Sequence, residues 1–295
     1  MVFHIQKRKH TPLNFLVTLS LKMKYLNIAI ITLTEDGLKT ARRIGTSFNP
    51  APSTYVFKKI GGENNYIVEK MISPHIIYFS EPLQQLVNRI FKQYDGLVFI
   101  MAMGIVIRVI AQNIGNKHTD PAVVVIDDVG RFVISVLSGH EGGANLLTHR
   151  IAAIMHTDAI ITTGTEAKKD IIVGIGCKKG ITSEAIKKSI IDTLQRVNLT
   201  LERVRLLATI EIKSEELGLL QAAEELDIPL RIVSCMEIST CLKEYGRSDF
   251  VKKKIGVWGV CEPVALLSGR KTELLLKKQK YPGVTVAIAR ENFMW

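Results

Sequence analysis

Residues 122–155 read AVVVIDDVGRFVISVLSGHEGGANLLTHRIAAIM, and they decide the fold of the first half of the chain. Two apolar runs rich in Val and Ile flank an Asp-Asp-Val-Gly turn, which predicts a β-hairpin. After the second run, apolar residues recur at helical spacing from about Gly143 onward. The glycine-rich segment 138–145, SGHEGGAN, therefore joins the carboxyl end of a strand to the amino end of a helix.

Other short apolar runs alternate with amphipathic stretches along the chain. Runs rich in Val and Ile on consecutive positions are typical of strands buried on both faces, so helices are expected to cover them. In the first half these strands are expected at 27–33, 75–80, 96–101, 122–127, 132–137 and 158–164. In the second half strands are expected at 171–176, 204–212 and 230–234, with helices over 183–197 and 214–226. The sequence predicts an α/β fold with two domains, each a mostly parallel sheet with helices on both faces.

The polar segment 165–170 marks the predicted boundary between the two domains. The first domain is expected to span 25–167 and the second 168–295, after a basic extension over 1–24. That extension carries five cations and no acid. We expect it to be disordered or not native, with Met23 as the working initiator. A targeting segment is the alternative, because a basic start precedes a short apolar run.

Composition excludes several classes of protein. The chain has 295 residues, of which 47% are hydrophobic and 23% charged, a balance typical of globular proteins. The net charge is +11, and five of these charges lie in residues 1–24. Aromatic residues make up 6% and are not interleaved with basic runs, so we expect no nucleic-acid partner. The apolar runs are too short to span a membrane, so we expect no membrane association.

Cysteine usage favours a reducing, cytoplasmic location. Cys177, Cys235, Cys241 and Cys261 form no C-x-x-C pair and no zinc-like spacing. Asp120, Asp127 and Asp128 stand close together in the sequence, but Asp-Pro and Asp-Asp-Val-Gly are common in turns. We therefore assign no metal ligand to the protein.

The SGHEGGAN segment is the strongest candidate site. His140 and Glu141 are adjacent, and an imidazole beside a carboxylate can act as a general base with its partner. Gly142 and Gly143 allow close approach to backbone amides, which favour anions at a helix start. The alternative is a structural turn in which the glycines take positive φ and Ser138 or Asn145 caps the helix.

A second strand end is expected at 96–101, followed by Gly104 and a helix bearing Arg108. We expect this turn to lie on the same edge of the sheet as SGHEGGAN. Alone, Arg108 is equally compatible with a solvated helix residue. Asp127 and Arg131 add a carboxylate and a further cation in the predicted hairpin turn.

The stretch 171–186, IIVGIGCKKGITSEAI, combines a strand, a glycine-rich turn and a helix. Its G-x-G-x-x-x-G spacing fits neither the dinucleotide nor the Walker fingerprint. The better interpretation is an anion site built from turn amides with Lys178 and Lys179. Cys177 is interpreted as a small buried residue, with a nucleophile as the alternative.

The run from Gly96 to Thr165 resembles the amino-terminal region of the CbiG family, the cobalt-precorrin-5A hydrolases of the oxygen-independent cobalamin pathway. VGIGCKKGITSEAI, GVCEPVALLSG and PGVTVAIAR, at 173–186, 259–269 and 282–290, resemble its carboxyl-terminal domain. This resemblance implies a cytoplasmic enzyme acting on a cobalt-bearing tetrapyrrole rimmed with carboxylates. Such an enzyme opens a δ-lactone and releases acetaldehyde. The cobalt belongs to the substrate, so no resident cofactor is expected.

The resemblance also suggests roles for individual residues. His140 would be the general base with Glu141 as its partner, while the amides of Gly142 and Gly143 would hold the oxyanion. Cations would bind peripheral carboxylates, and further residues would contact the substrate. The expected cations are Arg108, Arg131, Lys178 and Lys179. The other expected substrate contacts are Gly104, Asp127, Ser138, Gly139, Gly142, Gly143, Asn145, Gly174, Gly176 and Cys177. A homodimer and contacts with other corrin-pathway enzymes are further expectations.

One departure from the family concerns the junction. Family members often carry a further segment between the two matching regions, whereas TTGTEAKKDIIVGIGC, at 162–177, joins them almost directly here. The chain would then be a compact form of the family or a relative with altered activity. Two other functions stay open: a non-catalytic corrinoid-binding or accessory protein of the same pathway, and, last, a nucleotide-binding α/β protein.

Overall fold

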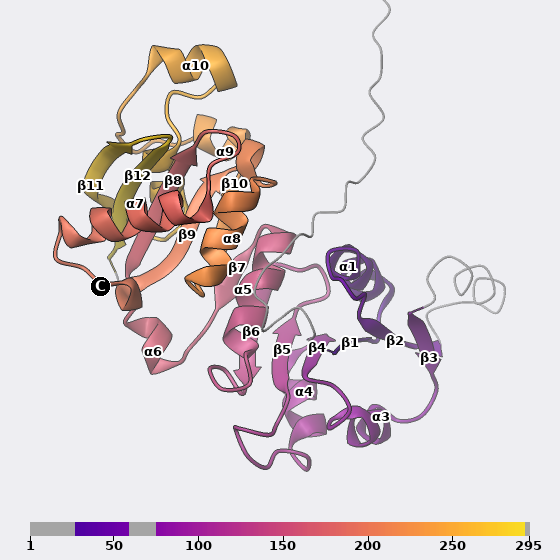
Figure 1. Cartoon of the computed structure of the whole chain (residues 1–295). Helices are drawn as coiled ribbons and strands as arrows, with labels where there is room; N and C mark the ends of the chain where they lie inside the picture. The colour runs from indigo at the N-terminus through magenta and orange to yellow at the C-terminus, as the bar shows by residue number, and fades with distance from the viewer. Residues whose placement is uncertain (1–26, 59–74, 293–295) are drawn as a thin grey trace, which may run out of the picture.

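The computed structural model describes residues 27–58 and 75–292, which form two sheets flanked by helices (Figure 1). The strands of the first sheet lie between Ile28 and Ile160, and those of the second between Ile171 and Glu291. The two sheets fall on either side of 165–170, where the sequence predicts a domain boundary. The predicted extension, residues 1–24, lies outside the described residues.

The first sheet has seven strands in the order β3-β2-β1-β4-β5-β6-β7. They are β1 (Ile28–Thr32), β2 (Ser53–Phe57), β3 (Ile76–Phe79), β4 (Gly96–Ile100), β5 (Ala122–Ile126), β6 (Phe132–Leu137) and β7 (Asp158–Ile160). The first five are parallel, whereas β6 runs antiparallel to β5 and parallel to β7. The hairpin prediction is therefore confirmed, and β6 and β7 point opposite to the rest of the sheet.

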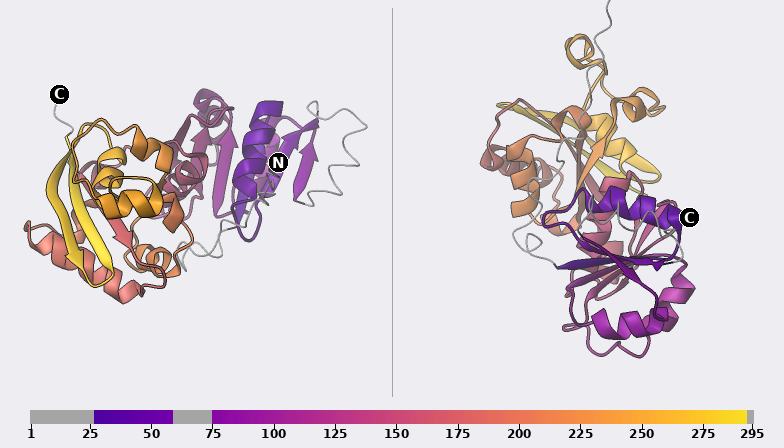
Figure 2. Two further views of the ribbon diagram at one scale, coloured as in Figure 1. Left: turned by 90° about the horizontal axis from the view of Figure 1, so that it is seen from above. Right: turned by 90° about the vertical axis from the view of Figure 1, so that its right-hand side faces the viewer.

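Helices cover both faces of the first sheet (Figure 2). One face carries α1 (Glu35–Gly45) and α5 (Ala144–Met155), whose apolar residues share a core with β1, β4 and β5. The other face carries α3 (Leu83–Ile90) and α4 (Met103–Ile110), which contribute to a second core. The central strands are buried on all positions, as runs of consecutive apolar residues predict.

The second sheet has the order β10-β9-β8-β12-β11. Its strands are β8 (Ile171–Cys177), β9 (Val204–Ile210), β10 (Leu230–Val233), β11 (Thr272–Tyr281) and β12 (Val284–Glu291). The first three are parallel, but β12 pairs antiparallel with both β8 and β11. This sheet is mixed rather than mostly parallel. The difference arises because the chain ends in a hairpin, whose turn at Gly283 has φ +79°.

Helices also cover both faces of the second sheet. α7 (Ser183–Gln195) and α8 (Leu217–Glu225) pack on one face, while α9 (Cys235–Ser239) and α11 (Cys261–Leu267) pack on the other. The shorter elements are α6 (Gly164–Ala167), η2 (Leu201–Arg203), η3 (Glu211–Lys213) and the protruding helix α10 (Asp249–Ile255). The helix predicted over 214–226 begins later, at Leu217, with Glu216 as its N-cap, and follows the 3₁₀ helix η3. In the described residues no helix is long and apolar enough to cross a membrane.

Candidate functional site

The SGHEGGAN loop connects the carboxyl end of β6 to α5, as predicted. Its backbone folds back on itself: the amides of Gly142 and Ala144 both donate to the Ser138 carbonyl oxygen, at 3.1 and 3.2 Å. The amide of Asn145 donates to the carbonyl oxygen of Gly139 at 2.9 Å. The Gly142 amide is therefore engaged within the loop, and in this conformation it cannot also hold an oxyanion.

Ser138 and Gly143 shape the loop through left-handed backbone conformations. Ser138 has φ +56°, which is uncommon for a residue with a side chain, and it is buried. Its hydroxyl has no hydrogen-bond partner among the described residues. Gly143 has φ +82° and is the N-cap of α5, without a side-chain cap. Neither Ser138 nor Asn145 caps the helix, so that part of the alternative interpretation is wrong, whereas Gly143 does take the positive φ expected of a structural turn.

Asn145 ties the loop to its neighbours. Its side-chain oxygen accepts a hydrogen bond from the Ser135 hydroxyl at 2.8 Å, and its amide group donates to the Thr163 hydroxyl at 3.0 Å. A Cβ at Gly139 would lie 2.9 Å from the Asn145 side-chain oxygen. Buried and fully engaged in this way, Asn145 holds β6, the loop and the segment after β7 together.

His140 and Glu141 are both exposed at the tip of the loop. Glu141 pairs with Lys117, whose ammonium lies 2.7 Å from the Glu141 carboxylate. This contact lowers the pKa of Glu141 below its usual range. Glu141 thus has an ion-pair partner in Lys117 that the sequence analysis did not predict, and its partnership with His140 stays a prediction.

Sequence reasoning missed Lys117, although a signal was present. Lys117 precedes β5, and Glu141 follows β6. Since β5 and β6 form an antiparallel hairpin, the start of one strand lies beside the end of the other.

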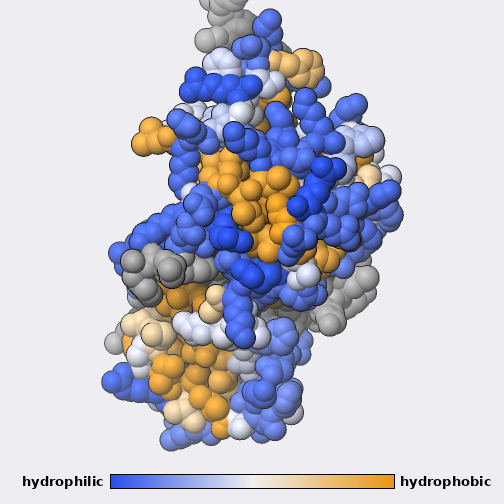
Figure 3. Space-filling view, turned by 90° about the vertical axis from the view of Figure 1, so that its left-hand side faces the viewer, coloured by the Kyte–Doolittle hydropathy of each residue, from blue (hydrophilic) through white to orange (hydrophobic). Residues whose placement is uncertain are grey.

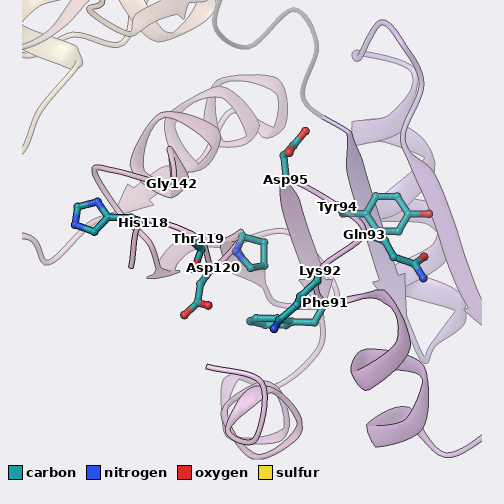
Figure 4. Close-up of a pocket in the computed structure, with 10 residues that line it drawn as sticks. Phe91, Lys92, Gln93, Tyr94, Asp95, His118, Thr119, Asp120 and Gly142 are labelled. Carbon is teal, nitrogen blue, oxygen red and sulfur yellow. The ribbon is translucent and has the colours of Figure 1, made fainter. Parts of the chain in front are cut away.

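A cavity of about 610 Å³ opens beside the loop (Figure 4). It is formed by the residues that precede β4, those that precede β5, and one glycine of the loop. The lining residues are Phe91, Lys92, Gln93, Tyr94, Asp95, His118, Thr119, Asp120, Pro121 and Gly142. Asp120 is buried and accepts the Gly115 amide at 2.9 Å, which orders the chain before β5. The SGHEGGAN loop therefore belongs to the edge where β4 and β5 begin.

Gly104, Arg108, Asp127 and Arg131 lie at the opposite edge of the same sheet, after β4 and β5. The expectation that the turn with Gly104 and Arg108 shares an edge with SGHEGGAN is wrong, because β6 runs antiparallel to β4 and β5. Six residues of extended strand separate the two edges, a span of about 20 Å.

The residues at this second edge bind one another. Arg108 donates to the Gly104 carbonyl oxygen at 2.7 Å. Arg131 donates through its Nε to Asp127 at 2.8 Å, and the backbone amides of Arg131 and Phe132 also donate to this carboxylate. Burial alone would raise the pKa of Asp127, but these hydrogen bonds outweigh it and lower the pKa.

The predicted anion site in the second sheet lies at the carboxyl end of β8, whereas the amino end of β8 faces α6 and the first sheet. Gly174 is buried under α11, where a Cβ would overlap the Cys261 carbonyl oxygen, so it serves packing rather than ligand binding. Gly176 packs against Thr285 and Val260. Burial raises the pKa of the Cys177 thiol to about 11, which argues against a nucleophile.

Lys178 and Lys179 are exposed at the same end of β8. Lys178 donates its backbone amide to the Gly283 carbonyl oxygen at 2.9 Å. The length of β8, seven residues, places these lysines about 20 Å from the junction between the two sheets. The structure therefore does not bring them together with the SGHEGGAN loop.

A charged cluster between the two sheets was not predicted. His149 of α5 lies 3.6 Å from the Glu166 carboxylate, which Lys169 also contacts at 2.6 Å. Burial alone would raise the pKa of Glu166, but His149 and Lys169 outweigh it and lower the pKa to about 2. His149 thus contacts the short segment between the two sheets. No group of three or more His, Cys, Asp or Glu in the described ranges could hold a metal ion.

Comparison with known proteins adds relatives that span both sheets. A relative from Priestia megaterium named cobalt-precorrin-5A hydrolase is 27% identical over 359 aligned positions, covering 88% of this chain and 94% of the relative. This alignment is longer than the whole chain of 295 residues, so the relative contains positions with no counterpart here. A Salmonella typhimurium protein of the same name is 37% identical over 143 residues, covering 48% of this chain and 37% of the relative.

A solved structure of a cobalamin biosynthesis protein G homolog from Sulfolobus solfataricus is 21% identical and covers 92% of this chain and all of its own, with a TM-score of 0.35. Two family models match the chain. The model described as cobalamin synthesis G N-terminal matches residues 85–166, and the one described as cobalamin synthesis G C-terminus matches residues 171–289. Together they span most of the described chain, on both sides of the junction. The chain belongs to the cobalamin synthesis G (CbiG) family.

Proposed function

We propose that this chain hydrolyses cobalt-precorrin-5A, opening its lactone and releasing acetaldehyde to give cobalt-precorrin-5B. The proposal is carried by the similarity to the Priestia megaterium relative named cobalt-precorrin-5A hydrolase. The alignment covers 94% of that relative and 88% of this chain, and so reaches both sheets. The SGHEGGAN loop has an exposed His140, and its Gly142 lines a cavity, so the loop offers a place for the chemistry.

In the proposed mechanism His140 acts as the general base toward water. The water oxygen bonds to the lactone carbonyl carbon as its proton passes to the imidazole, and the carbon–oxygen bond of the ring ester then breaks. The Gly143 amide, at the amino terminus of α5, is the remaining loop candidate for the oxyanion, because the Gly142 amide is engaged by Ser138. Lys117 holds Glu141 and with it the tip of the loop.

Acetaldehyde leaves in a second step. The alcohol released by lactone opening loses its proton, the carbon–carbon bond to the macrocycle breaks, and the electron pair stays on the macrocycle, which takes up a proton. No oxidant or reductant is needed for this sequence. The cobalt is part of the substrate, so we propose no resident cofactor.

We also propose a cytoplasmic location, which the four free cysteines favour. An anionic cobalt tetrapyrrole is the proposed ligand. Other enzymes of the pathway and a second copy of this chain are proposed partners, whereas nucleic acid and membranes are not.

The test incubates the purified protein anaerobically with cobalt-precorrin-5A and measures both acetaldehyde and the mass of the macrocycle. The proposal predicts one acetaldehyde released per substrate, with a matching mass change. Binding of the substrate without acetaldehyde would instead indicate a non-catalytic carrier or accessory protein of the same pathway.

A further inference from the structure

β6 and β7, at one end of the first sheet, carry partly exposed apolar residues on the face away from α5. α5 packs on these strands on the side of Val133 and Ala159. Because side chains alternate along a strand, Phe132 and Ile134 point to the opposite face, and Ile134 pairs with Ile160 of β7. Phe132 is 41% exposed, which is high for an apolar strand residue.

α4 adds an apolar flank beside this face. Val106, Val109 and Ile110 are buried against the sheet, and Gln84 of α3 donates to the Val109 carbonyl oxygen at 2.8 Å. Helical spacing places Met103 and Ile107 on the flank away from α3, toward β5 and β6. Each is 46% exposed.

These residues form one apolar surface, which we call the β6–α4 surface. It consists of Phe132, Met103 and Ile107, which are exposed, and of Ile134, Val136 and Ile160, which are half-buried. Val136 also packs against the core that contains the buried residues of α4. Figure 3, seen from the side on which β6 and β7 lie, shows an apolar area on this lower part of the molecule. Contiguous exposed apolar area is typical of a binding surface.

A cation stands at one end of the β6–α4 surface. The Arg131 guanidinium lies 5.7 Å from the centre of the Phe132 ring, and its side chain is 70% exposed. Within the described residues, the Arg131 side chain donates to Asp127 through its Nε. A guanidinium has five N–H donors, so others remain for a ligand. Arg131 can therefore bind a carboxylate that lies beside the Phe132 ring.

The SGHEGGAN loop stands at the other end, since β6 runs from Phe132 to Leu137 and leads directly into Ser138. The β6–α4 surface thus connects the two groups of candidate residues that the antiparallel strand places at opposite edges. A ligand lying along β6 can reach both groups, whereas a ligand confined to either edge cannot.

We propose that the β6–α4 surface binds the apolar ring face of a carboxylate-rimmed macrocycle, with Arg131 binding a carboxylate of its rim and the reacting group directed toward the SGHEGGAN loop. The identity of the macrocycle as cobalt-precorrin-5A rests on the proposed function. The surface and its orientation rest on the contacts above.

The test compares Ile107→Glu with Ile105→Glu. Both residues lie on α4 and have similar exposure, 46% and 41%, but helical spacing places Ile105 on the flank toward α3. Glutamate is a good helix former, so both variants should fold. A carboxylate against an apolar ring face loses its hydration and repels the rim, so Ile107→Glu should raise the KM for cobalt-precorrin-5A about tenfold or more. Its kcat should stay within about twofold, and Ile105→Glu should resemble the wild type.

Two results with these variants would overturn the proposal. An unchanged KM in Ile107→Glu, or the same rise in both variants, overturns the proposal. If Ile107→Glu instead converts a dimer to monomers with KM unchanged, as sedimentation would show, the surface is an interface between copies and the proposal is wrong.

An absorbance titration with cobalt-precorrin-5A separates this inference from the proposed function. Should the wild type bind without releasing acetaldehyde while Ile107→Glu fails to bind, the surface assignment stands and the hydrolase assignment falls. If the wild type does not bind, both fall.

Discussion

Gly142 lies where the loop after β6 turns back toward Ser138. A Cβ built there would overlap the Ser138 Cβ, lie 3.0 Å from the Ser138 carbonyl oxygen and lie 3.3 Å from the Asp120 carbonyl oxygen. Two of these neighbours are backbone atoms, which cannot rotate away. The sequence shows only a pair of adjacent glycines, and the structure shows that the first is required by close packing and the second by its positive φ.

Gly142→Ala should displace the loop and with it His140. We expect a loss of about 1–3 kcal/mol in the free energy of unfolding, as for other overpacked sites. A shift of the base by a fraction of an ångström should lower kcat about ten- to a hundredfold. Urea denaturation and acetaldehyde release measure the two effects. Gly164→Ala is the control, because nothing lies within 4 Å of its Cβ position. Equal activity of both variants would show that the loop conformation is not needed.

At the scale of elements, α11 approaches β8 so closely that only glycine fits between them. The Cys261 carbonyl oxygen occupies the place of a Cβ at Gly174, and Ala265 lies next to it. This contact lets Val264 and Ala265 join Ile172 and Ala289 in one core. The IIVGIG segment resembles a phosphate-binding turn in sequence, but its first glycine serves helix packing.

Gly174→Ala should force α11 away from the sheet. The expected loss in the free energy of unfolding is about 3 kcal/mol, since the obstructing atom belongs to the backbone of a packed helix. Thermal denaturation followed by circular dichroism measures it. Gly45→Ala is a matched control, because the Cβ position at Gly45 meets only Pro52 at 3.9 Å. A Tm for Gly174→Ala equal to that of the control would contradict this account of the packing.

Most strands could be predicted from the sequence because consecutive apolar residues mark strands buried on both faces. β2 was missed because its STYVF run is short and mixed, and β11 because its TELLLKKQKY run has only one short apolar segment in an otherwise polar strand. β12, with the run VTVAIARE, was missed as well. The Pro-Gly turn between β11 and β12 was a usable signal for the final hairpin.

The arrangement of the candidate site was harder to predict than its residues. The hairpin was predicted correctly. Because its strands are antiparallel, β6 ends at the edge where β5 begins, and the predicted edge for the SGHEGGAN loop did not take this into account. Lys117 and His118 therefore meet the SGHEGGAN loop, and Arg108 does not. Contacts between side chains distant in sequence, such as Glu166 with His149, have no periodic signal in a single sequence.

At the scale of the whole molecule, charged side chains join the two sheets. Arg270, before β11, lies 2.8 Å from Asp158 of β7. His149 and Lys169 contact Glu166, within the short segment that leads from one sheet to the other. This segment separates the two family matches by only four residues. The cluster thus orders the short junction between the two sheets.

Glu166→Gln should show how much this cluster contributes to the free energy of unfolding and how that contribution depends on pH. The folded-state pKa of Glu166 lies near 2, below its usual 4.5, so its ionised form stabilises the folded protein. That stabilisation is complete above about pH 4.5 and is lost as the pH falls toward 2. The wild type should therefore exceed Glu166→Gln in the free energy of unfolding, on the order of 2 kcal/mol at pH 6, and the gap should close in acid. The exposed Glu273→Gln serves as control, and a gap that does not depend on pH would contradict this assignment.

The central claim is that the loop after β6 carries out hydrolysis of the macrocycle lactone, and His140 tests it most directly. Acetaldehyde release from cobalt-precorrin-5A should be measured anaerobically for the wild type and for His140→Ala, with circular dichroism to confirm folding and an absorbance titration to confirm binding. The account predicts release by the wild type and a kcat about a hundredfold or more lower in a folded, substrate-binding His140→Ala. Release by His140→Ala at the wild-type rate would contradict it.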